Sequence, residues 1–396
     1  MFTKIKVCWF ATICSLVLLP GCADFSLNRS PATVSVSSIV PANYFGMHVG
    51  FVTPGTPWPA VPFGTWRLWD DANVTWKDLE PQKGVWDFSK LDAFVALAQQ
   101  HKVDIILPLA LTPRWASERP SEPSSYTPGA AAPPSNLQDW IDYVQTVTAR
   151  YKGKIGNYEM WNEANFAVTW TGTPEQLVNL QQAAYVVIKN NDPQAQLISA
   201  NIDAMCGLPY LEKLLSLGYA NSADIIGYHF YVSPNRPEAI AILASQVTSL
   251  LSHYGANKPL WNTETGWLPP SRFTSDDQAA AVVVRAMLVG HSSGIGRFVW
   301  YEWDNHCCVT LFMTETDNAT PTRAALARGQ HFRFLFTEWG QNLVVRLAVC
   351  GWPPRCHPLE HRWTNNNRRK AELDTCPRRG HVRERVGSTG HASACR

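Results

Sequence analysis

The chain lacks the usual sequence signals of metal and nucleotide binding. Of its ten cysteines, only Cys206, Cys307 and Cys308 lie between residues 23 and 330, and their spacing matches no zinc site. No Gly-rich phosphate-binding motif follows the first apolar segment. We therefore expect neither a metal nor a cofactor. The three cysteines could form a vicinal Cys307–Cys308 disulfide, pair through Cys206, or stay as free, buried thiols.

Positive charge is scarce over most of the chain. The formal net charge is +2, but residues 331–396 carry 12 Lys/Arg against 5 Asp/Glu, which leaves residues 1–330 at about −5. A surface that holds nucleic acid needs a basic patch to neutralise phosphates. The composition of the main body therefore excludes a nucleic-acid partner.

The apolar run near the N-terminus is too short to cross a membrane. Lys4 and Lys6 precede an apolar segment from Val7 to Leu19, and Pro20-Gly21-Cys22 follows. This layout is typical of an export signal. Its last four residues resemble a bacterial lipobox, in which the cysteine becomes the lipid-carrying N-terminus.

The lipobox predicts a signal peptide over residues 1–21, followed by a linker over residues 22–43 that begins at the lipidated Cys22. The lipid would anchor the protein to a membrane without crossing it. Ala23, in place of Asp, resembles lipoproteins that are sent to the outer membrane, so we expect the protein there, facing the periplasm. The alternative is an ordinary signal peptide with an incidental cysteine.

Short apolar segments alternate with amphipathic ones from Tyr44 to about residue 327. Eight such units favour a closed parallel barrel over an open sheet, because parallel strands need crossover helices. The fold class is therefore α/β, a (β/α)8 TIM barrel over residues 44–330, with a different α/β sheet as the alternative. The eight candidate strands are 44–51, 65–70, 103–111, 157–163, 196–202, 224–231, 258–265 and 296–303.

Helix starts and the end of the barrel are also marked. Capping boxes are predicted at Ser135-x-x-Gln138, Thr173-Pro174-x-Gln176 and Ser275-x-x-Gln278. The alternation stops after about residue 326, and residues 331–396 are basic, lack a sustained period and hold four of the ten cysteines. We expect an irregular tail there, either a small disulfide-bearing appendage or a poorly folded, non-native extension.

Two glutamates fall at the ends of predicted strands. Glu163 ends the fourth strand and Glu264 closes the seventh. The carboxyl ends of barrel strands meet at one mouth, so these carboxylates can approach one bond from opposite sides. Cleavage of a glycosidic bond needs such a pair, one to protonate the leaving oxygen and one to attack or stabilise the cationic carbon.

Neighbouring polar residues suit the same chemistry. Asn162 can hydrogen-bond the sugar 2-hydroxyl. Arg67 and Tyr231 can hydrogen-bond Glu264 and keep it ionised, although Arg67 is alternatively a purely structural ion pair. His229 can orient Tyr231, contact substrate or raise the pKa of the acid, and is otherwise a core histidine.

Aromatic and acidic residues lie near the predicted strand ends. Aromatic faces stack on the apolar faces of sugar rings. Candidate platforms are Trp69, Trp115, Trp170, Trp267 and Trp303, and candidate rim acids are Asp70, Asp71 and Asp304. Glu159 lies too deep in its strand for a role at the rim.

Seven stretches carry a family resemblance over residues 44–304: FGMHV, PFGTWRLWD, WDFSKLD, PLALTPRWAS, YEMWNEAN, IGYHFYVSP and KPLWNTETGW. Together they resemble the clan A retaining glycoside hydrolases, in particular family 39 and its Psl-type exopolysaccharide hydrolases. The resemblance implies that Glu163 is the general acid/base, that Glu264 is the nucleophile and that Trp300 forms the floor of the first sugar subsite. Cys307-Cys308 and the lack of a legible β-rich accessory domain depart from the family pattern.

We therefore expect a retaining glycoside hydrolase that cuts within a bacterial exopolysaccharide. The alternatives are a non-catalytic glycan-binding lipoprotein of polysaccharide assembly and a transglycosylase that uses the same residues. The sequence indicates no particular protein partner, sugar or linkage.

Overall fold

The computed structural model describes residues 40–52, 57–69, 72–268, 273–304, 311, 313–315, 317, 319–327, 349–351 and 355–357. The chain divides into two units, Met1–Gly340 and Gln341–Arg396. The predicted signal peptide, Cys22, most of the linker, Asp70, Asp71 and the Cys307-Cys308 pair lie outside the described residues, as does most of the tail.

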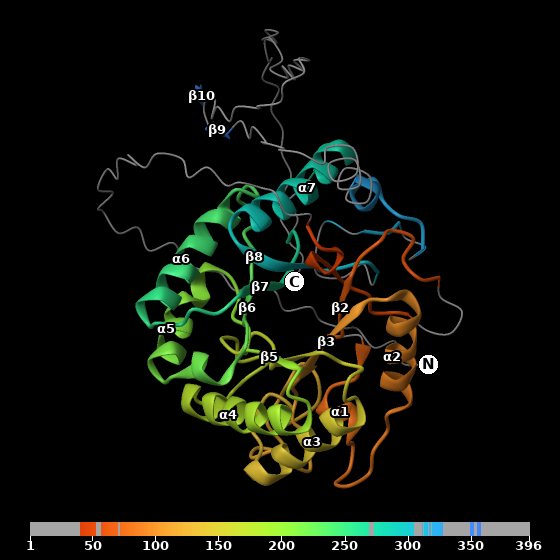
Figure 1. The fold of residues 1–396 in the computed structure, drawn as a ribbon, viewed down its shortest axis with the longest axis vertical. Helices are drawn as coiled ribbons and strands as arrows, with labels where there is room; N and C mark the ends of the chain where they lie inside the picture. Colours follow the sequence, from red (N-terminus) through yellow and green to blue (C-terminus); the bar gives the residue numbers. More distant parts are fainter. Residues whose placement is uncertain are drawn as a thin grey trace, which may run out of the picture. The chain divides into compact units, whose positions relative to one another are not determined.

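The first unit is a parallel eight-stranded sheet that curls into a barrel (Figure 1). The strand order is β5-β4-β3-β2-β1-β8-β7-β6, so β1 pairs with β8 and consecutive strands are paired except β5 and β6, which form the two edges. All eight predicted strands are confirmed. They are β1 (Phe45–His48), β2 (Thr65–Arg67), β3 (Asp104–Leu109), β4 (Asn157–Met160), β5 (Gln196–Ile198), β6 (Ile226–His229), β7 (Leu260–Thr265) and β8 (Ile295–Trp300).

The remaining gap in the barrel lies between β5 and β6. Two isolated parallel bridges cross it, Ile198 with Ile225 and Asp203 with His229. Apolar side chains from several strands fill the core, including Ile106, Ile198 and Val299, which are fully buried. The predicted (β/α)8 barrel is therefore confirmed, with its weakest strand pairing at this gap.

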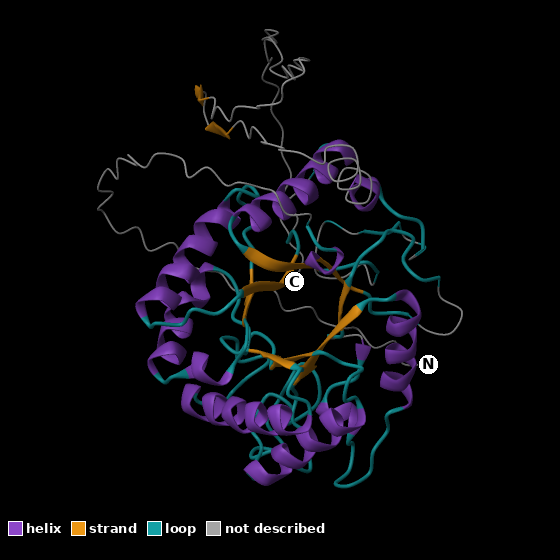
Figure 2. Ribbon diagram, viewed as in Figure 1, coloured by secondary structure: helices purple, strands orange, loops and turns teal. Residues whose placement is uncertain are grey.

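Helices surround the strands (Figure 2). The described α-helices are α1 (Trp76–Leu79), α2 (Ser89–His101), α3 (Leu137–Arg150), α4 (Pro174–Asn191), α5 (Leu208–Ser216), α6 (Ala239–His253) and α7 (Asp276–Ser292), and the 3-10 helices are η1 (Ala42–Tyr44), η3 (Met205–Gly207) and η4 (Tyr219–Ser222). No described helix is both long and apolar enough to span a membrane. The described parts of the β1–β2 connection, residues 49–52 and 57–64, contain no helix, so the first unit departs from the strand–helix repeat.

The predicted capping boxes have different outcomes. Thr173 and Gln176 form a complete box at α4, as predicted. At α7 the Ser275 hydroxyl accepts from the Gln278 amide, but the Gln278 side chain bonds Thr274 instead. The prediction at α3 is wrong, because Asn136 is the N-cap and its side chain accepts from the backbone of Gln138. An Asx cap one residue later satisfies the same free amide.

The long connection after β3 is tied to the loop that follows β4. Arg119 Nη2 donates to the carbonyl and hydroxyl oxygens of Thr171, at 3.0 and 2.8 Å. Glu122 binds both Arg119 and the Thr171 hydroxyl. These contacts fix the predicted rim loop against the segment that carries Glu163.

The second unit contains one described element, an antiparallel pair of β9 (Val349–Gly351) and β10 (Arg355–His357). Cys350 and Cys356 stand opposite each other in its register. The rest of the predicted irregular tail lies outside the described residues.

Candidate active site

The turn after β4 presents Glu163 in a strained conformation. Trp161 and Glu163 have φ values of 51° and 44°, in the left-handed region. Non-glycine residues there cost about 1–3 kcal/mol each, and they persist only where surrounding contacts hold them. Asn201 supplies such contacts: its Oδ1 accepts from the Glu163 amide at 2.6 Å and its Nδ2 donates to the Trp161 carbonyl at 3.2 Å.

The second glutamate is held by two donors. Glu264 lies near the end of β7, where Arg67 Nη1 donates to its Oε2 at 2.7 Å and the Tyr231 hydroxyl donates to its Oε1 at 2.8 Å. Both contacts predicted for Arg67 and Tyr231 therefore form. Burial raises the pKa of Tyr231 well above its usual value, and the negative charges of Glu264 and Glu163 raise it further, so the phenol stays a donor.

Arg67 is also a structural ion pair. It is buried, and its Nε lies 2.5 Å from Glu159 Oε2 while its Nη2 donates to Asn162 Oδ1 at 2.7 Å. Burial lowers the pKa of Arg67, but attraction to Glu159 and Glu264 outweighs it, so the pKa is raised overall. Arg67 therefore makes the predicted contact with Glu264 and also a structural ion pair with Glu159. Glu159 lies as deep as expected and acts as the buried counter-ion.

The contact with Arg67 fixes the orientation of Asn162. Because Oδ1 accepts from the guanidinium, the opposite edge of the amide presents its NH2 group. Asn162 can therefore donate to a ligand oxygen, as expected for the sugar 2-hydroxyl.

The two glutamates lie beside different histidines. His229 Nδ1 lies 2.9 Å from Glu163 Oε1, so the predicted influence of His229 falls on the acid and not on Tyr231 by a hydrogen bond. Burial lowers the pKa of His229 well below its usual value, and the Arg67 charge lowers it further, so the imidazole is neutral. His48, at the end of β1, has its Nε2 3.7 Å from Glu264 Oε2.

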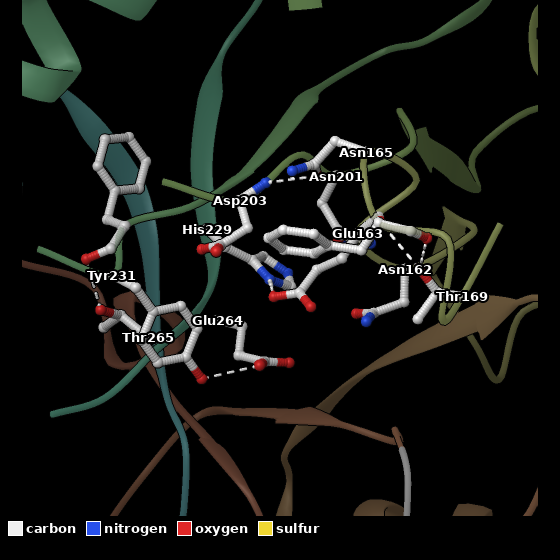
Figure 3. A network of polar contacts seen from close by, with 12 residues as sticks. Asn162, Glu163, Asn165, Thr169, Asn201, Asp203, His229, Tyr231, Glu264 and Thr265 are labelled. Carbon is white, nitrogen blue, oxygen red and sulfur yellow. Dashed lines mark hydrogen bonds and ion pairs between the residues drawn. The ribbon is translucent and has the colours of Figure 1, made fainter. Parts of the chain in front are cut away.

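Figure 3 shows the carboxyl groups of Glu163 and Glu264 directed toward the same space, with Asn162 and His229 beside Glu163 and Tyr231 beside Glu264. In the sheet register His229 pairs with Glu264, while its side chain contacts Glu163. One residue of β6 therefore connects the two glutamates.

Several residues of the site were not predicted from the sequence. These are His48, Asn201 and Asp203. All three lie at or just beyond predicted strand ends, and this position could have been used to find them. The sequence does not indicate what each side chain contacts, because the partners come from other strands.

One group of side chains offers metal-ligand atoms. Oxygen atoms of Glu163 and Asp203 and a ring nitrogen of His229 all lie within 4.8 Å of one another. His229 Nδ1 already contacts the Glu163 carboxyl group.

The aromatic residues do not form an open platform. Trp300 is 0 % exposed and its ring stacks on that of Trp267, with centroids 6.4 Å apart and planes at 6°. Sugar stacking on Trp300 would require the side chains that cover it to move, so its subsite role stays a prediction, as does that of Trp267. Trp115 contacts α1 instead, since its Nε1 donates to the Glu80 carbonyl and its ring meets Trp76 edge to face.

Other candidates have structural partners. Asp304 accepts from the amides of Gly50 and Phe51, at 2.7 and 3.0 Å, so it holds the chain after β1. Trp69 lies 5.8 Å from the Arg67 guanidinium and meets Tyr126 of the long loop edge to face. Trp170 and Trp303 are buried.

Comparisons with known proteins give one family match. Residues 68–131 match the model of glycoside hydrolase family 42, described as beta-galactosidase. No curated protein sequence matches the chain. The family match covers β3 and part of the long loop, and contains neither glutamate.

Solved structures with similar folds include three glycosidases. A glucosidase from Croceicoccus marinus has a TM-score of 0.59 at 16% identity, covering 76% of this chain and 69% of that one. A family 39 glycoside hydrolase from Bacteroides cellulosilyticus WH2 has 0.54 at 17%, covering 68% and 59%. A monomeric beta-xylosidase from Caulobacter crescentus CB15 has 0.57 at 16%, covering 75% and 69%.

The chain is similar in fold to these three glycosidases. At 16–17% sequence identity, the structural similarity to these glycosidases shows a shared fold. The family match and the paired glutamates support glycoside hydrolase activity. The finer resemblance to Psl-type exopolysaccharide hydrolases stays a prediction.

Proposed function

We propose that the protein is a retaining glycoside hydrolase in which Glu163 is the general acid/base and Glu264 the nucleophile. The observation that carries this proposal is the contrast between their partners. Glu264 receives hydrogen bonds from a cationic Arg67 and from Tyr231, which favour its ionised form. Glu163 contacts a neutral His229.

The first step forms a glycosyl–enzyme ester. Glu163 gives its proton to the glycosidic oxygen, the bond from that oxygen to the anomeric carbon breaks, and a Glu264 oxygen bonds to the same carbon. Arg67 and Tyr231 aim the attacking carboxylate. The Asn162 NH2 group donates to the sugar 2-hydroxyl, a contact that strengthens in the transition state.

The second step releases the sugar. The Glu163 carboxylate takes a proton from water as the water oxygen bonds to the anomeric carbon, and the ester bond to Glu264 breaks. Both glutamates return to their starting protonation states. The anomeric configuration is retained because the carbon is inverted twice.

The proposed substrate is a bacterial exopolysaccharide, cut within the chain. The motifs shared with Psl-type hydrolases support this choice, and the lipobox at Cys22 supports an outer-membrane location facing the periplasm. The long loop after β3 is hydrogen-bonded to the Glu163 loop through Arg119 and Thr171. This contact does not distinguish a polymer from a short oligosaccharide, so the size of the products decides whether the enzyme cuts within the chain.

The test is product analysis by mass spectrometry on the full chain with mannose-rich and glucose-rich exopolysaccharides. Wild type should release oligosaccharides of several lengths at early times, with retained configuration by NMR. Glu264→Gln should bind polymer without turnover, while Glu212→Gln, at an exposed carboxylate on α5, should act like wild type. Release of a single terminal sugar would contradict the endo mode.

The same experiment separates the two alternatives. A non-catalytic glycan-binding protein would give no products from wild type that still binds polymer. A transglycosylase would give products longer than the starting oligosaccharides when an acceptor sugar is supplied. Either result would overturn hydrolysis as the main activity.

A further inference from the structure

Asp203 has a position fixed by both the Glu163 loop and the His229 strand. Its backbone amide donates to Asn165 Oδ1 at 3.0 Å, two residues beyond Glu163. Asp203 also forms a parallel β-bridge with His229. The His229 amide donates to the Ile202 carbonyl, and the Ala204 amide donates to the His229 carbonyl. These contacts cross the gap between β5 and β6, so the side chain of Asp203 is placed by the closure of the barrel.

The Asp203 carboxyl group lies beside the acid/base. One of its oxygens, one oxygen of Glu163 and a ring nitrogen of His229 are within 4.8 Å of one another, and Figure 3 shows the three side chains together. The Asp203 Oδ1 atom is buried and has no hydrogen-bond partner among the described residues. Two carboxyl groups this close resist being ionised together.

The surrounding charges do not relieve that repulsion. Within the described part of the chain, no Lys or Arg forms a salt bridge with Asp203, and Arg67 is bonded to Glu159, Glu264 and Asn162. Burial raises the pKa of Asp203 well above its usual value, and the negative charge of Glu264 raises it further. The titratable and charged groups around the pair are Arg67, Glu264, Glu159, His48, His229, Tyr228, Tyr231 and Cys206.

We propose that Asp203 is a positioning residue for the proton of Glu163: the two carboxyl groups titrate as a coupled pair and hold one proton between them to higher pH than Glu163 would alone. The inference rests on the proposed function of Glu163. Asp203 would be a third carboxyl group that influences the reaction, beside Glu163 and Glu264, which take part in the bond changes. Asp203 itself neither touches the anomeric carbon nor loses a proton to substrate in the reaction.

Asp203→Asn tests the coupling, because it removes the second ionisable carboxyl group and keeps the shape. The basic limb of the kcat/KM profile should move down by about one pH unit or more, while the acid limb stays in place. On the basic side of the optimum, turnover of polysaccharide should fall about tenfold or more. An aryl glycoside with an activated leaving group, which needs little protonation, should fall much less. An equal loss on both substrates with an unmoved basic limb would mean a structural role and overturn the proposal.

A second measurement does not depend on enzyme activity. Coupling is reciprocal, so Glu163→Gln should lower the pH at which Asp203 ionises. An infrared titration of the carboxyl carbonyl stretch, with isotope-labelled aspartate and with Asp203→Asn to assign the band, follows this directly. An Asp203 band that titrates at the same pH with and without Glu163 would refute the coupling even if Asp203→Asn failed to fold. An active Glu264→Gln variant would instead refute the proposed function, so the two failures are distinguishable.

Discussion

Arg67 Nη1 donates to Glu264 Oε2 at 2.7 Å, joining the end of β2 to the end of β7 through the barrel interior. The same guanidinium bonds Glu159 through Nε and Asn162 through Nη2. Three partners, from β4, the turn after it and β7, are thus held by one planar group. A planar group with separate donors is needed for this, and a lysine ammonium does not reproduce it.

Arg67→Lys should therefore lower kcat/KM by at least about 100-fold, or about 2.7 kcal/mol of transition-state free energy. It should also lower the melting temperature, because Glu159 keeps a buried charge with a poorer partner. Steady-state kinetics and calorimetry measure the two effects. Arg297→Lys is the matched control, since Arg297 is a buried barrel arginine that bonds Thr65 and Asp104. Equal activity losses in both variants would contradict a specific role for Arg67.

Tyr231→Phe should reduce kcat by about 10- to 100-fold, because a hydrogen bond to a charged group is worth about 1.5–3 kcal/mol. Loss of the donor makes the ionised Glu264 less favourable, so the acid limb of the pH–rate profile should move to higher pH. Tyr44→Phe is the control, as the Tyr44 hydroxyl donates to the Met287 carbonyl. An acid limb that stays in place would show that Tyr231 does not set the ionisation of the nucleophile.

Asn201→Ala should destabilise the protein by about 1–3 kcal/mol, because the buried Glu163 amide loses its acceptor. Activity should fall further than stability explains, since the left-handed turn at Glu163 is no longer held. Urea denaturation and kinetics on the same samples test this. Asn157→Ala, which removes a single hydrogen bond to Ile105 at the start of β4, should cost stability with little loss of activity.

His48 should make stability depend on pH. Burial lowers its pKa well below the usual value, and Arg67 lowers it further. Between its unfolded pKa of about 6.5 and its folded pKa, the unfolded chain binds the proton and the folded chain does not, so stability is full above pH 6.5 and falls as pH decreases. From pH 7.5 to 5.5, His48→Asn should lose about 1.4 kcal/mol less unfolding free energy than wild type, as measured by urea titration. An equal loss in the two proteins would mean that His48 binds its proton equally well in the folded and unfolded chains.

The two glutamates could be located from sequence because strand ends are local features. Apolar runs mark the strands, and parallel strands place their carboxyl ends at one mouth. Glu163 and Glu264 follow from that rule, as do Asn162, Arg67, Tyr231 and His229 as neighbours. The α3 cap was missed by one residue because Ser135 and Asn136 are both good caps, and local pattern does not choose between them.

The sequence alone determined the order of strands and helices, the barrel and the two glutamates, because each depends on periodicity and on chemistry carried by neighbouring residues. Only the tertiary structure decided that His229 contacts Glu163, that Glu159 neutralises Arg67, that Asn201 holds the Glu163 turn and that Trp300 packs under Trp267. It also brought Asp203 to Glu163. Each of these contacts joins residues from different strands or loops, and its direction depends on barrel closure and side-chain packing, which no local pattern records.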